Sequence, residues 1–221
     1  SSYMLTTLMR DLEMPKAIGE NIIVFRDNGN MYKTFWNGEI YEIDVWNNPQ
    51  FVNFKVGTDI MCFNDPTTQT FVVFDKGIFY DIEQLPMAKY KAGRGFVVYE
   101  DNSGNLWYYK DGERFQLSNF GADFWDVKDD IVVWTESSYF FAYCEGEKTE
   151  IANFKPLDYQ IKNNVLAYRN ILGGVNAFVG GESYQLTNMS DSNYAIYGSR
   201  VLVSMFNNSY IVLENGVQYK N

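Results

Sequence analysis

The chain has 221 residues, of which 46% are hydrophobic and 21% charged, so it is long enough to bury a substantial core and is not expected to be disordered. Its net charge of −10, with no segment rich in Lys and Arg, excludes nucleic acid and anionic membranes as expected partners. The lack of His excludes Ser-His-Asp and Cys-His catalysis and His-containing metal sites, and no apolar run approaches the roughly 18 residues of a membrane span.

Aromatic residues make up 18% of the chain, and aromatic residues are enriched in β-strands. We therefore expect the chain to consist mainly of strands. The first candidate strand lies within residues 1–9, where Ser2-Tyr3-Met4-Leu5-Thr6 resembles Ser183-Tyr184-Gln185-Leu186-Thr187. This likeness bears on how the two ends of the chain are used.

A repeat follows this segment. A Gly recurs about every 35 residues and is followed five residues later by Ile or Leu, in the pairs Gly38 and Ile43, Gly77 and Ile82, Gly112 and Leu117, Gly146 and Ile151, and Gly181 and Leu186. Gly216 occupies the next position. The predicted repeats are residues 10–47, 48–86, 87–121, 122–156, 157–190 and 191–221.

Each repeat has the same order of strand signals. Upstream of the Gly lies an apolar run of the kind found in strands covered on both faces: residues 22–25, 60–63, 96–99, 131–134, 165–168 and 201–203. Before it stands an aromatic residue followed two positions later by an aliphatic one, as in Phe54/Val56, Tyr90/Ala92, Trp125/Val127, Tyr159/Ile161 and Tyr194/Ile196. The first repeat departs from this pattern, with Lys16 and Ile18. Turn-forming clusters and a third strand follow, so we expect four strands per repeat.

Four short antiparallel strands repeated about every 35 residues, without helical periodicity, are typical of a β-propeller. We therefore predict an all-β, six-bladed β-propeller of four-stranded antiparallel blades. A seven-bladed ring and a segment of a longer propeller are the alternatives. A β-sandwich is disfavoured, because a sandwich gives no reason for its sequence to repeat.

The two ends of the chain compete for one position in this scheme. Residues 1–9 are a candidate outer strand that would close the ring on the last blade, and Gly216-Val217-Gln218-Tyr219-Lys220 also has the features of a fourth strand. The sequence leaves the choice open.

The repeat resembles six-bladed propellers of the TolB-like or YWTD-like kind, and the resemblance covers nearly the whole chain at the level of architecture. The YWTD tetrad, the Ser-Pro-Asp-Gly element of TolB-type repeats and the Gly-His dipeptide of WD40 blades do not occur. The resemblance therefore implies a fold and leaves the function open.

Two cysteines, Cys62 and Cys144, lie in apolar strands of different repeats at positions that are not equivalent. We expect them to be buried small side chains and not a disulfide.

Carboxylates gather near the start of the fourth and fifth repeats, as Asp123, Asp126, Asp129, Asp130 and Asp158. A pair of them in a central funnel could serve a glycoside hydrolase or hold calcium. The plainer interpretation is that Asp129 and Asp130 form a hairpin turn and Asp123 caps a loop, because Asp is common in turns. We predict no metal site and no cofactor.

Aromatic residues supply the other signal. Trp46, Phe120 and Phe154 lie in loops between repeats beside Asn residues, and Trp125, Tyr159 and Tyr194 begin strands. Most aromatics at equivalent repeat positions are expected to pack between blades, and a binding face is indicated if two or three of the loop aromatics are exposed. The candidate ligand-binding residues are Trp46, Phe120, Asp123, Trp125, Phe154, Asp158, Tyr159, Asn193 and Tyr194.

Three functions fit these features. The first is a non-catalytic propeller that acts as a scaffold or adaptor for a protein partner. The second is a lectin-like carbohydrate binder, which would need equivalent pockets, whereas the loop residues vary between repeats. The third is a carboxylate-based glycoside hydrolase. Few Lys, much Asn, Tyr and Phe, and a start without Met favour an exported bacterial protein of the periplasm or cell surface, and the composition also allows the cytoplasm.

Overall fold

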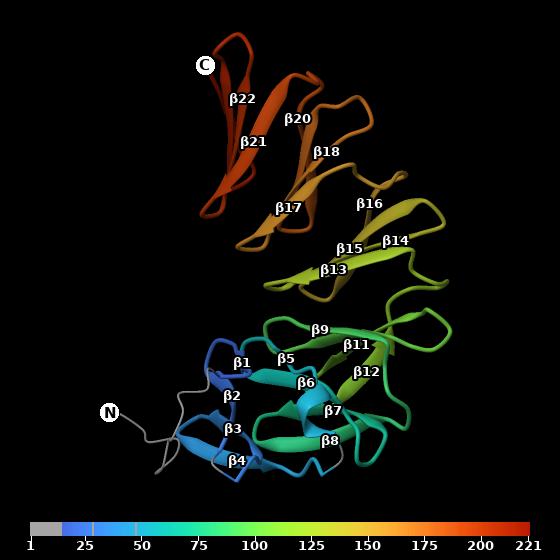
Figure 1. Ribbon diagram of the computed structural model, residues 1–221. Coiled ribbons are helices and arrows are strands. Elements are labelled where there is room, and N and C mark those ends of the chain that lie inside the picture. Colours follow the sequence, from blue (N-terminus) through green and yellow to red (C-terminus); the bar gives the residue numbers. More distant parts are fainter. Residues whose placement is uncertain (1–14, 28, 47) are drawn as a thin grey trace. The chain divides into compact units, whose positions relative to one another are not determined.

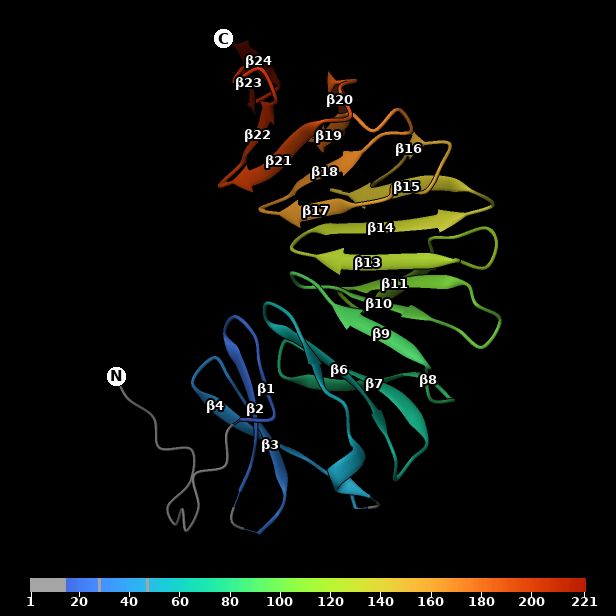
Figure 2. The ribbon, with the colours of Figure 1, turned by 45° about the horizontal axis from the view of Figure 1, so that its top comes forward.

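The computed structural model describes residues 15–27, 29–46 and 48–221. They form an all-β fold with six sheets and a short 3-10 helix, η1 (Pro49–Phe51) (Figures 1 and 2). Each sheet has four antiparallel strands that are consecutive in the chain, and we call the sheets blades 1 to 6. The chain divides into two compact units, unit 1 up to residue 119 and unit 2 from residue 120, and each is described by itself.

Unit 1 holds blades 1 to 3. Blade 1 contains β1 (Ala17–Ile18), β2 (Ile22–Arg26), β3 (Tyr32–Trp36) and β4 (Glu39–Ile43). Blade 2 contains β5 (Lys55–Val56), β6 (Ile60–Asp65), β7 (Thr70–Asp75) and β8 (Ile78–Glu83). Blade 3 contains β9 (Lys89–Ala92), β10 (Val97–Glu100), β11 (Leu106–Lys110) and β12 (Glu113–Gln116).

Unit 2 holds blades 4 to 6. Blade 4 contains β13 (Phe124–Lys128), β14 (Ile131–Glu136), β15 (Tyr139–Cys144) and β16 (Glu147–Ala152). Blade 5 contains β17 (Tyr159–Lys162), β18 (Val165–Arg169), β19 (Val175–Val179) and β20 (Glu182–Thr187). Blade 6 contains β21 (Ser192–Tyr197), β22 (Arg200–Met205), β23 (Tyr210–Glu214) and β24 (Val217–Lys220). The predicted four-stranded antiparallel blade is confirmed.

The recurring Gly is explained by the turn between the third and fourth strands. Both residues of this turn have positive φ in every blade, which defines the type I′ hairpin turn. In blade 3, Asp111 has a φ of 52° and Gly112 a φ of 84°. Gly adopts this conformation without the steric cost of a Cβ atom, so the turn selects Gly at its second position. The six turns are Asn37-Gly38, Lys76-Gly77, Asp111-Gly112, Glu145-Gly146, Gly180-Gly181 and Asn215-Gly216.

The continuous apolar runs are explained by cores on both faces of a blade. In β6, Met61 and Phe63 pack into the core that blade 2 shares with blade 1, whereas Ile60 and Cys62 pack into the core shared with blade 3. All four side chains are buried. In unit 2, separate cores likewise join blade 4 to blade 5 and blade 5 to blade 6. Each second strand is therefore apolar at successive positions instead of alternating.

The antiparallel order places the connections at two ends of every blade. One end, which we call the turn side, carries the turns from first to second and from third to fourth strand. The other end, the loop side, carries the turn from second to third strand and the loop that leads to the next blade. The two ends differ in composition, as described below.

In unit 1 the first turns of successive blades touch through their backbones. Thr58 N donates to Gly93 O at 3.2 Å, and Gly95 N donates to Thr58 O at 3.0 Å. A Cβ atom on Gly57 would lie 1.9 Å from Gly93 O, so only Gly allows this approach. The short spacing of the backbones thus depends on a glycine of the first turn, outside the six type I′ turns.

In unit 2 side chains make the equivalent connection. Asn163 N donates to Asp129 Oδ2 at 2.7 Å, and Asn164 Nδ2 donates to Asp130 Oδ2 at 2.6 Å. Asp129 and Asp130 are therefore turn residues that link blade 4 to blade 5, as the plainer interpretation of the sequence had it.

The outer position of blade 6 is filled by the C-terminal segment. β24 pairs with β23 through Leu213↔Gln218 and its neighbours, which confirms the predicted fourth strand at residues 216–220. The competing candidate at residues 1–9 lies outside the described residues. Cys62 and Cys144 are free thiols, as expected, but only Cys62 is buried, whereas Cys144 is half-buried. Across the described part of the chain, no helix has the length and apolar character to span a membrane.

Candidate functional site

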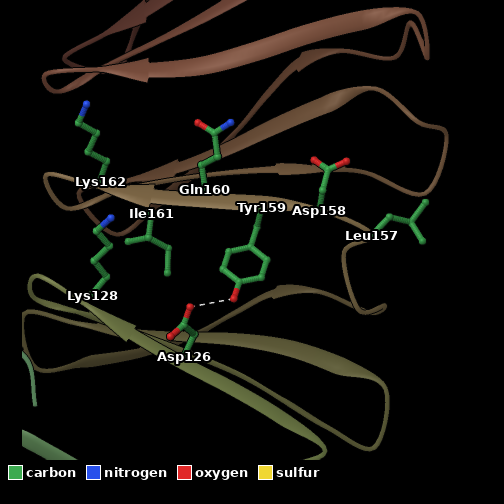
Figure 3. Close-up of a pocket in the computed structure, with 8 residues that line it drawn as sticks. All are labelled: Asp126, Lys128, Leu157, Asp158, Tyr159, Gln160, Ile161 and Lys162. Atoms are coloured by element: carbon green, nitrogen blue, oxygen red, sulfur yellow. Dashed lines mark hydrogen bonds between the residues drawn. The ribbon is translucent and has the colours of Figure 1, made fainter. Parts of the chain in front are cut away.

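Unit 2 has a polar pocket of about 570 Å³ along the first strands of blades 4 and 5 (Figure 3). We call it the first-strand pocket. It is lined by Asp126, Lys128, Leu157, Asp158, Tyr159, Gln160, Ile161 and Lys162. The residues come from β13, from β17 and from the loop between blades 4 and 5, so strands hold most of them in place.

Tyr159 and Asp126 join the two strands across this pocket. The Tyr159 hydroxyl donates to Asp126 Oδ2 at 2.8 Å, and burial together with this carboxylate raises the pKa of Tyr159 (Figure 3). The Tyr159 ring also lies 5.5 Å from the Phe124 ring in an edge-to-face contact. Asp126 is thus used to fasten a neighbouring blade.

Lys128 and Lys162 occupy equivalent positions at the ends of successive first strands and extend side by side (Figure 3). Both are exposed, and neither side chain makes a hydrogen bond or ion pair with another described residue. The pocket therefore combines two exposed ammonium groups with two carboxylates that already have partners.

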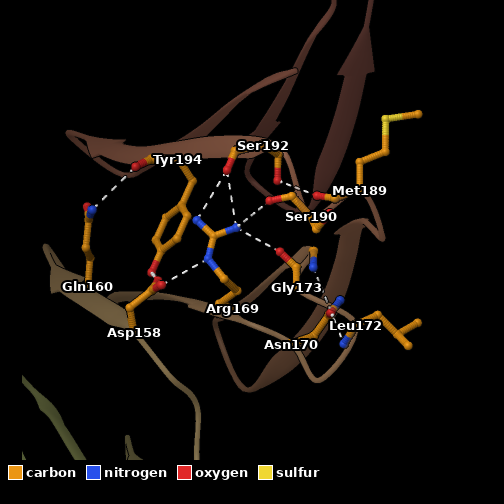
Figure 4. Close-up of polar contacts among 11 residues, drawn as sticks. Asp158, Gln160, Arg169, Asn170, Leu172, Gly173, Met189, Ser190, Ser192 and Tyr194 are labelled. Carbon is orange, nitrogen blue, oxygen red and sulfur yellow. Dashed lines mark hydrogen bonds and ion pairs between the residues drawn. The ribbon is translucent and has the colours of Figure 1, made fainter. Parts of the chain in front are cut away.

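Asp158 is held by a second network, which is centred on Arg169 (Figure 4). Arg169 Nε donates to Asp158 Oδ2 at 2.9 Å, and the Tyr194 hydroxyl donates to Asp158 Oδ1. Burial acts to raise the pKa of Asp158, but the hydrogen bonds from Tyr194 and Arg169 outweigh it and hold that pKa below its usual value. A general acid needs the opposite shift, so Asp158 is poorly suited to that role.

Arg169 also fastens two loops on the loop side of unit 2. Its Nη1 donates to Gly173 O at 2.7 Å, and Nη1 and Nη2 each donate to Ser192 O at 3.2 Å (Figure 4). Asn170 adds to this connection, because its Nδ2 donates to Thr187 O at 3.4 Å and its Oδ1 accepts from Leu172 N at 3.0 Å. One arginine and one asparagine thus order the turn 170–174 against the loop 187–192.

The predicted site residues separate into three groups. Asp158, Tyr159 and Tyr194 come together around the first-strand pocket and Arg169. Trp125 is buried, and Phe154 is half-buried against the core shared by blades 4 and 5, so neither is an exposed loop aromatic. Asp123 and Asn193 are exposed.

Trp46 and Phe120 are 69% and 65% exposed. Two of the three loop aromatics are therefore exposed, which is the number that would indicate a binding face. Trp46 belongs to unit 1 and Phe120 to unit 2. Sequence reasoning assigned no binding role to six residues of this site: Arg169, Lys128, Leu157, Gln160, Ile161 and Lys162.

Exposed apolar side chains mark the loop side in both units. Every large apolar side chain that is exposed in a connection between described strands lies on this side. In unit 1 these are Trp46, Phe51 and Leu85, and in unit 2 they are Phe120, Leu157, Ile171, Leu172, Met189 and Phe206. The turn side carries mainly Gly and polar residues instead.

Comparison with known families agrees with this architecture. The sequence matches the family model described as "10-bladed beta propeller domain" over residues 2–219. The chain belongs to this family. In the described residues, the blades of this propeller are the six four-stranded sheets. No curated protein matches the sequence.

Solved structures with similar folds share little sequence with this chain. Human WBSCR16 has 6% identity and a TM-score of 0.48, with 88% of this chain and 74% of that chain covered. Prp20p from Saccharomyces cerevisiae has 8% identity and a TM-score of 0.46, with 89% and 70% covered. The computationally designed Ika8 protein has 13% identity and a TM-score of 0.42, with 98% and 89% covered. The fold assignment rests on the family and on the sheets themselves.

Proposed function

We propose that the protein is a non-catalytic β-propeller that binds a protein partner through the loop side of unit 2. The observation that carries this proposal is the ordering of exposed apolar side chains by Arg169. Leu157, Leu172 and Met189 are 87%, 64% and 45% exposed, and each is next to a residue that Arg169 contacts: Asp158, Gly173 and Ser190. Leu172 and Met189 extend outward from the ordered loops in Figure 4.

Ordered loops favour binding, because a side chain that is already fixed loses less conformational entropy in a complex. Exposed apolar groups surrounded by polar ones are typical of protein interaction sites. We call Leu157, Ile171, Leu172, Met189 and Phe206 the loop-side patch. Its residues all belong to unit 2 and to connections of blades 4 to 6.

The two other functions have less support. A glycoside hydrolase needs a carboxylic acid with a raised pKa, whereas the pKa of Asp158 is lowered and Asp126 accepts from Tyr159. A lectin with equivalent pockets needs matching residues, whereas Asp126 of blade 4 is replaced by Gln160 in blade 5 and Ala195 in blade 6. Both remain alternatives to the binding of a protein.

The number of blades in the complete ring is part of the same proposal. The family is described as ten-bladed, and six blades are present in the described residues. This favours the alternative in which these blades belong to a longer propeller over a closed ring of six. We place the protein in the bacterial cell envelope, on composition alone. Imaging of the full-length gene product by electron microscopy would count its blades.

Site-specific photo-cross-linking in the native cells tests the binding face. A benzophenone amino acid at Leu172 should give a discrete protein adduct. The matched control is Glu145, which is exposed on the turn side of the same unit. Equal adducts at the two positions, or none at Leu172, would refute a partner on the loop side.

A further inference from the structure

Unit 1 contains a second concave site, on its loop side between blades 1 and 2. Its volume is about 300 Å³, and we call it the Trp46 pocket. The floor is apolar, since Ile43, Phe63 and Val72 line it and are almost completely buried. The residues that line it come from β4 of blade 1, from β6, β7 and β8 of blade 2, and from the adjoining loops, and these two blades share one core.

Trp46 also lines this pocket, from a loop that is anchored to blade 2. Trp46 N donates to Thr67 Oγ1 at 2.8 Å, and Thr67 N in turn donates to Asp65 Oδ1 at 2.7 Å. The backbone of Trp46 is therefore tied to the turn of blade 2, while its side chain stays 69% exposed. An exposed Trp held in this way presents an aromatic face to whatever enters the pocket.

Four carboxylates line the pocket, on Glu42, Asp44, Asp65 and Asp81. Lys33 pairs with Glu42 at 3.3 Å, and Asp81 Oδ1 accepts from Thr70 Oγ1 at 2.7 Å. Asp44 is exposed and has no side-chain partner among the described residues. One nearby ammonium group against four carboxylates leaves the pocket strongly negative.

The arrangement of these acids does not suit a metal ion. Within the described ranges, no three or more Asp, Glu or Cys side chains are close enough together to hold one. The carboxylates instead share the pocket with apolar side chains and with Trp46. An organic cation, with an alkyl part and a charged end, matches all three surfaces.

We propose that the Trp46 pocket receives the side chain of a Lys or Arg from a partner protein. The alkyl part would lie on Ile43, Phe63 and Val72, and the charged end would face Trp46 and Asp44. The volume lies at the lower limit of ligand pockets, roughly 300 to 1,000 Å³, which suits one side chain. This inference rests on the proposed function, because it supposes a protein partner, and it names the chemistry by which that partner is recognised.

The test uses nuclear magnetic resonance on the whole chain labelled with nitrogen-15. The chain has five Trp residues, and the indole N–H signal that is missing in Trp46→Ala is that of Trp46. The probes are the capped peptides Gly-Gly-Lys-Gly-Gly and Gly-Gly-Arg-Gly-Gly. We expect a saturable shift of the Trp46 signal with at least one of them, and none with the Nε-acetyl-lysine peptide, which lacks the charge.

Two substitutions, each of which removes a single carboxylate, separate specific binding from a general effect of charge. Asp44→Asn should weaken binding of the peptide about fivefold, as expected for loss of one partly screened charge contact. Asp191→Asn, which removes an exposed carboxylate from a loop of unit 2, should leave the affinity unchanged.

Three outcomes overturn the inference: no shift with either cationic peptide, an equal shift with the acetylated peptide, or a saturable shift with Ca²⁺ in place of the peptides. The proposed function can fail separately. If cross-linking at Leu172 succeeds while the peptides do not bind, the binding face stands and the Trp46 pocket is not a cation site. If the peptides bind and cross-linking gives no adduct, the loop-side patch of unit 2 is not the binding face.

Discussion

Arg169 and Asp158 face each other across the hairpin that opens blade 5. Arg169 N donates to Asp158 O at 3.0 Å, and the side chains form an ion pair at 2.9 Å. From this position the guanidinium reaches Gly173 and Ser192 and stacks 5.4 Å from the centre of the Tyr194 ring. A single side chain thus joins Asp158, which precedes β17, and Tyr194 of β21 to two loops of the proposed binding face.

Arg169→Ala should destabilise unit 2 by about 2 to 4 kcal/mol, because it leaves carbonyl groups and Asp158 without a charged donor. The matched control is Arg200→Ala. Arg200 pairs with Glu214 but its side chain is 55% exposed, so its loss should cost about 0.5 kcal/mol. Thermal unfolding measures both, and equal shifts in Tm would show that Arg169 has no special role.

Asp158→Asn should remove a pH dependence of stability. The folded-state pKa of Asp158 is lowered from 3.8, so its ion pair stabilises the fold above about pH 4 and is lost as the pH falls through the lowered pKa. Urea unfolding at several pH values between 2 and 7 should give the wild type an advantage that shrinks in acid. A constant difference between the two proteins across this range would contradict the assignment.

Asp75→Asn in unit 1 should change the pH dependence of stability in the opposite direction to Asp158→Asn. Burial raises the pKa of Asp75, and the Asp111 carboxylate also raises it, against the effect of Lys76. The folded state therefore holds the proton more tightly, and the contribution of Asp75 to stability falls as the pH rises through the raised pKa. The variant should be more stable than the wild type at pH 7 and lose this gain below pH 4. A lower Tm at pH 7 would contradict the prediction.

Gly57→Ala should destabilise unit 1 by about 3 kcal/mol, because the new methyl group would meet Gly93 O at 1.9 Å. Gly112→Ala is the control for backbone conformation, since Gly112 has a φ of 84° and open space around the position of a Cβ. It should cost only about 1 to 2 kcal/mol. If Gly112→Ala were the more damaging of the two in thermal unfolding, close contact between the turns would not be what fixes Gly57.

The repeat could be predicted from the sequence because each turn imposes a local requirement. The type I′ turn at Asp111-Gly112 needs a residue that tolerates positive φ, so its Gly recurs and is easy to recognise. The role of Gly57 could not be found in this way, because it depends on Gly93 in the next blade.

The candidate site was predicted only in part. Asp158, Tyr159 and Tyr194 were named from their places at the starts of first strands, and they do come together. Arg169 was overlooked, although the register of the hairpin sets it opposite Asp158, as Glu100 is set opposite Lys89 in blade 3. Trp125 has the same place in its repeat as Tyr159, yet it is buried whereas Tyr159 is half-buried, a difference that the repeat pattern does not predict.

The most direct test of the central claim is the affinity of the cross-linked partner for variants of the loop-side patch, measured by calorimetry. Leu172→Asp should weaken binding about 30-fold or more, because the loss of an apolar anchor at an interface costs roughly 2 kcal/mol or more. Glu145→Lys, on the turn side of the same unit, should bind like the wild type. If Leu172→Asp bound the partner with wild-type affinity, the account would be contradicted. A loss of affinity in Glu145→Lys would place the partner on the turn side instead.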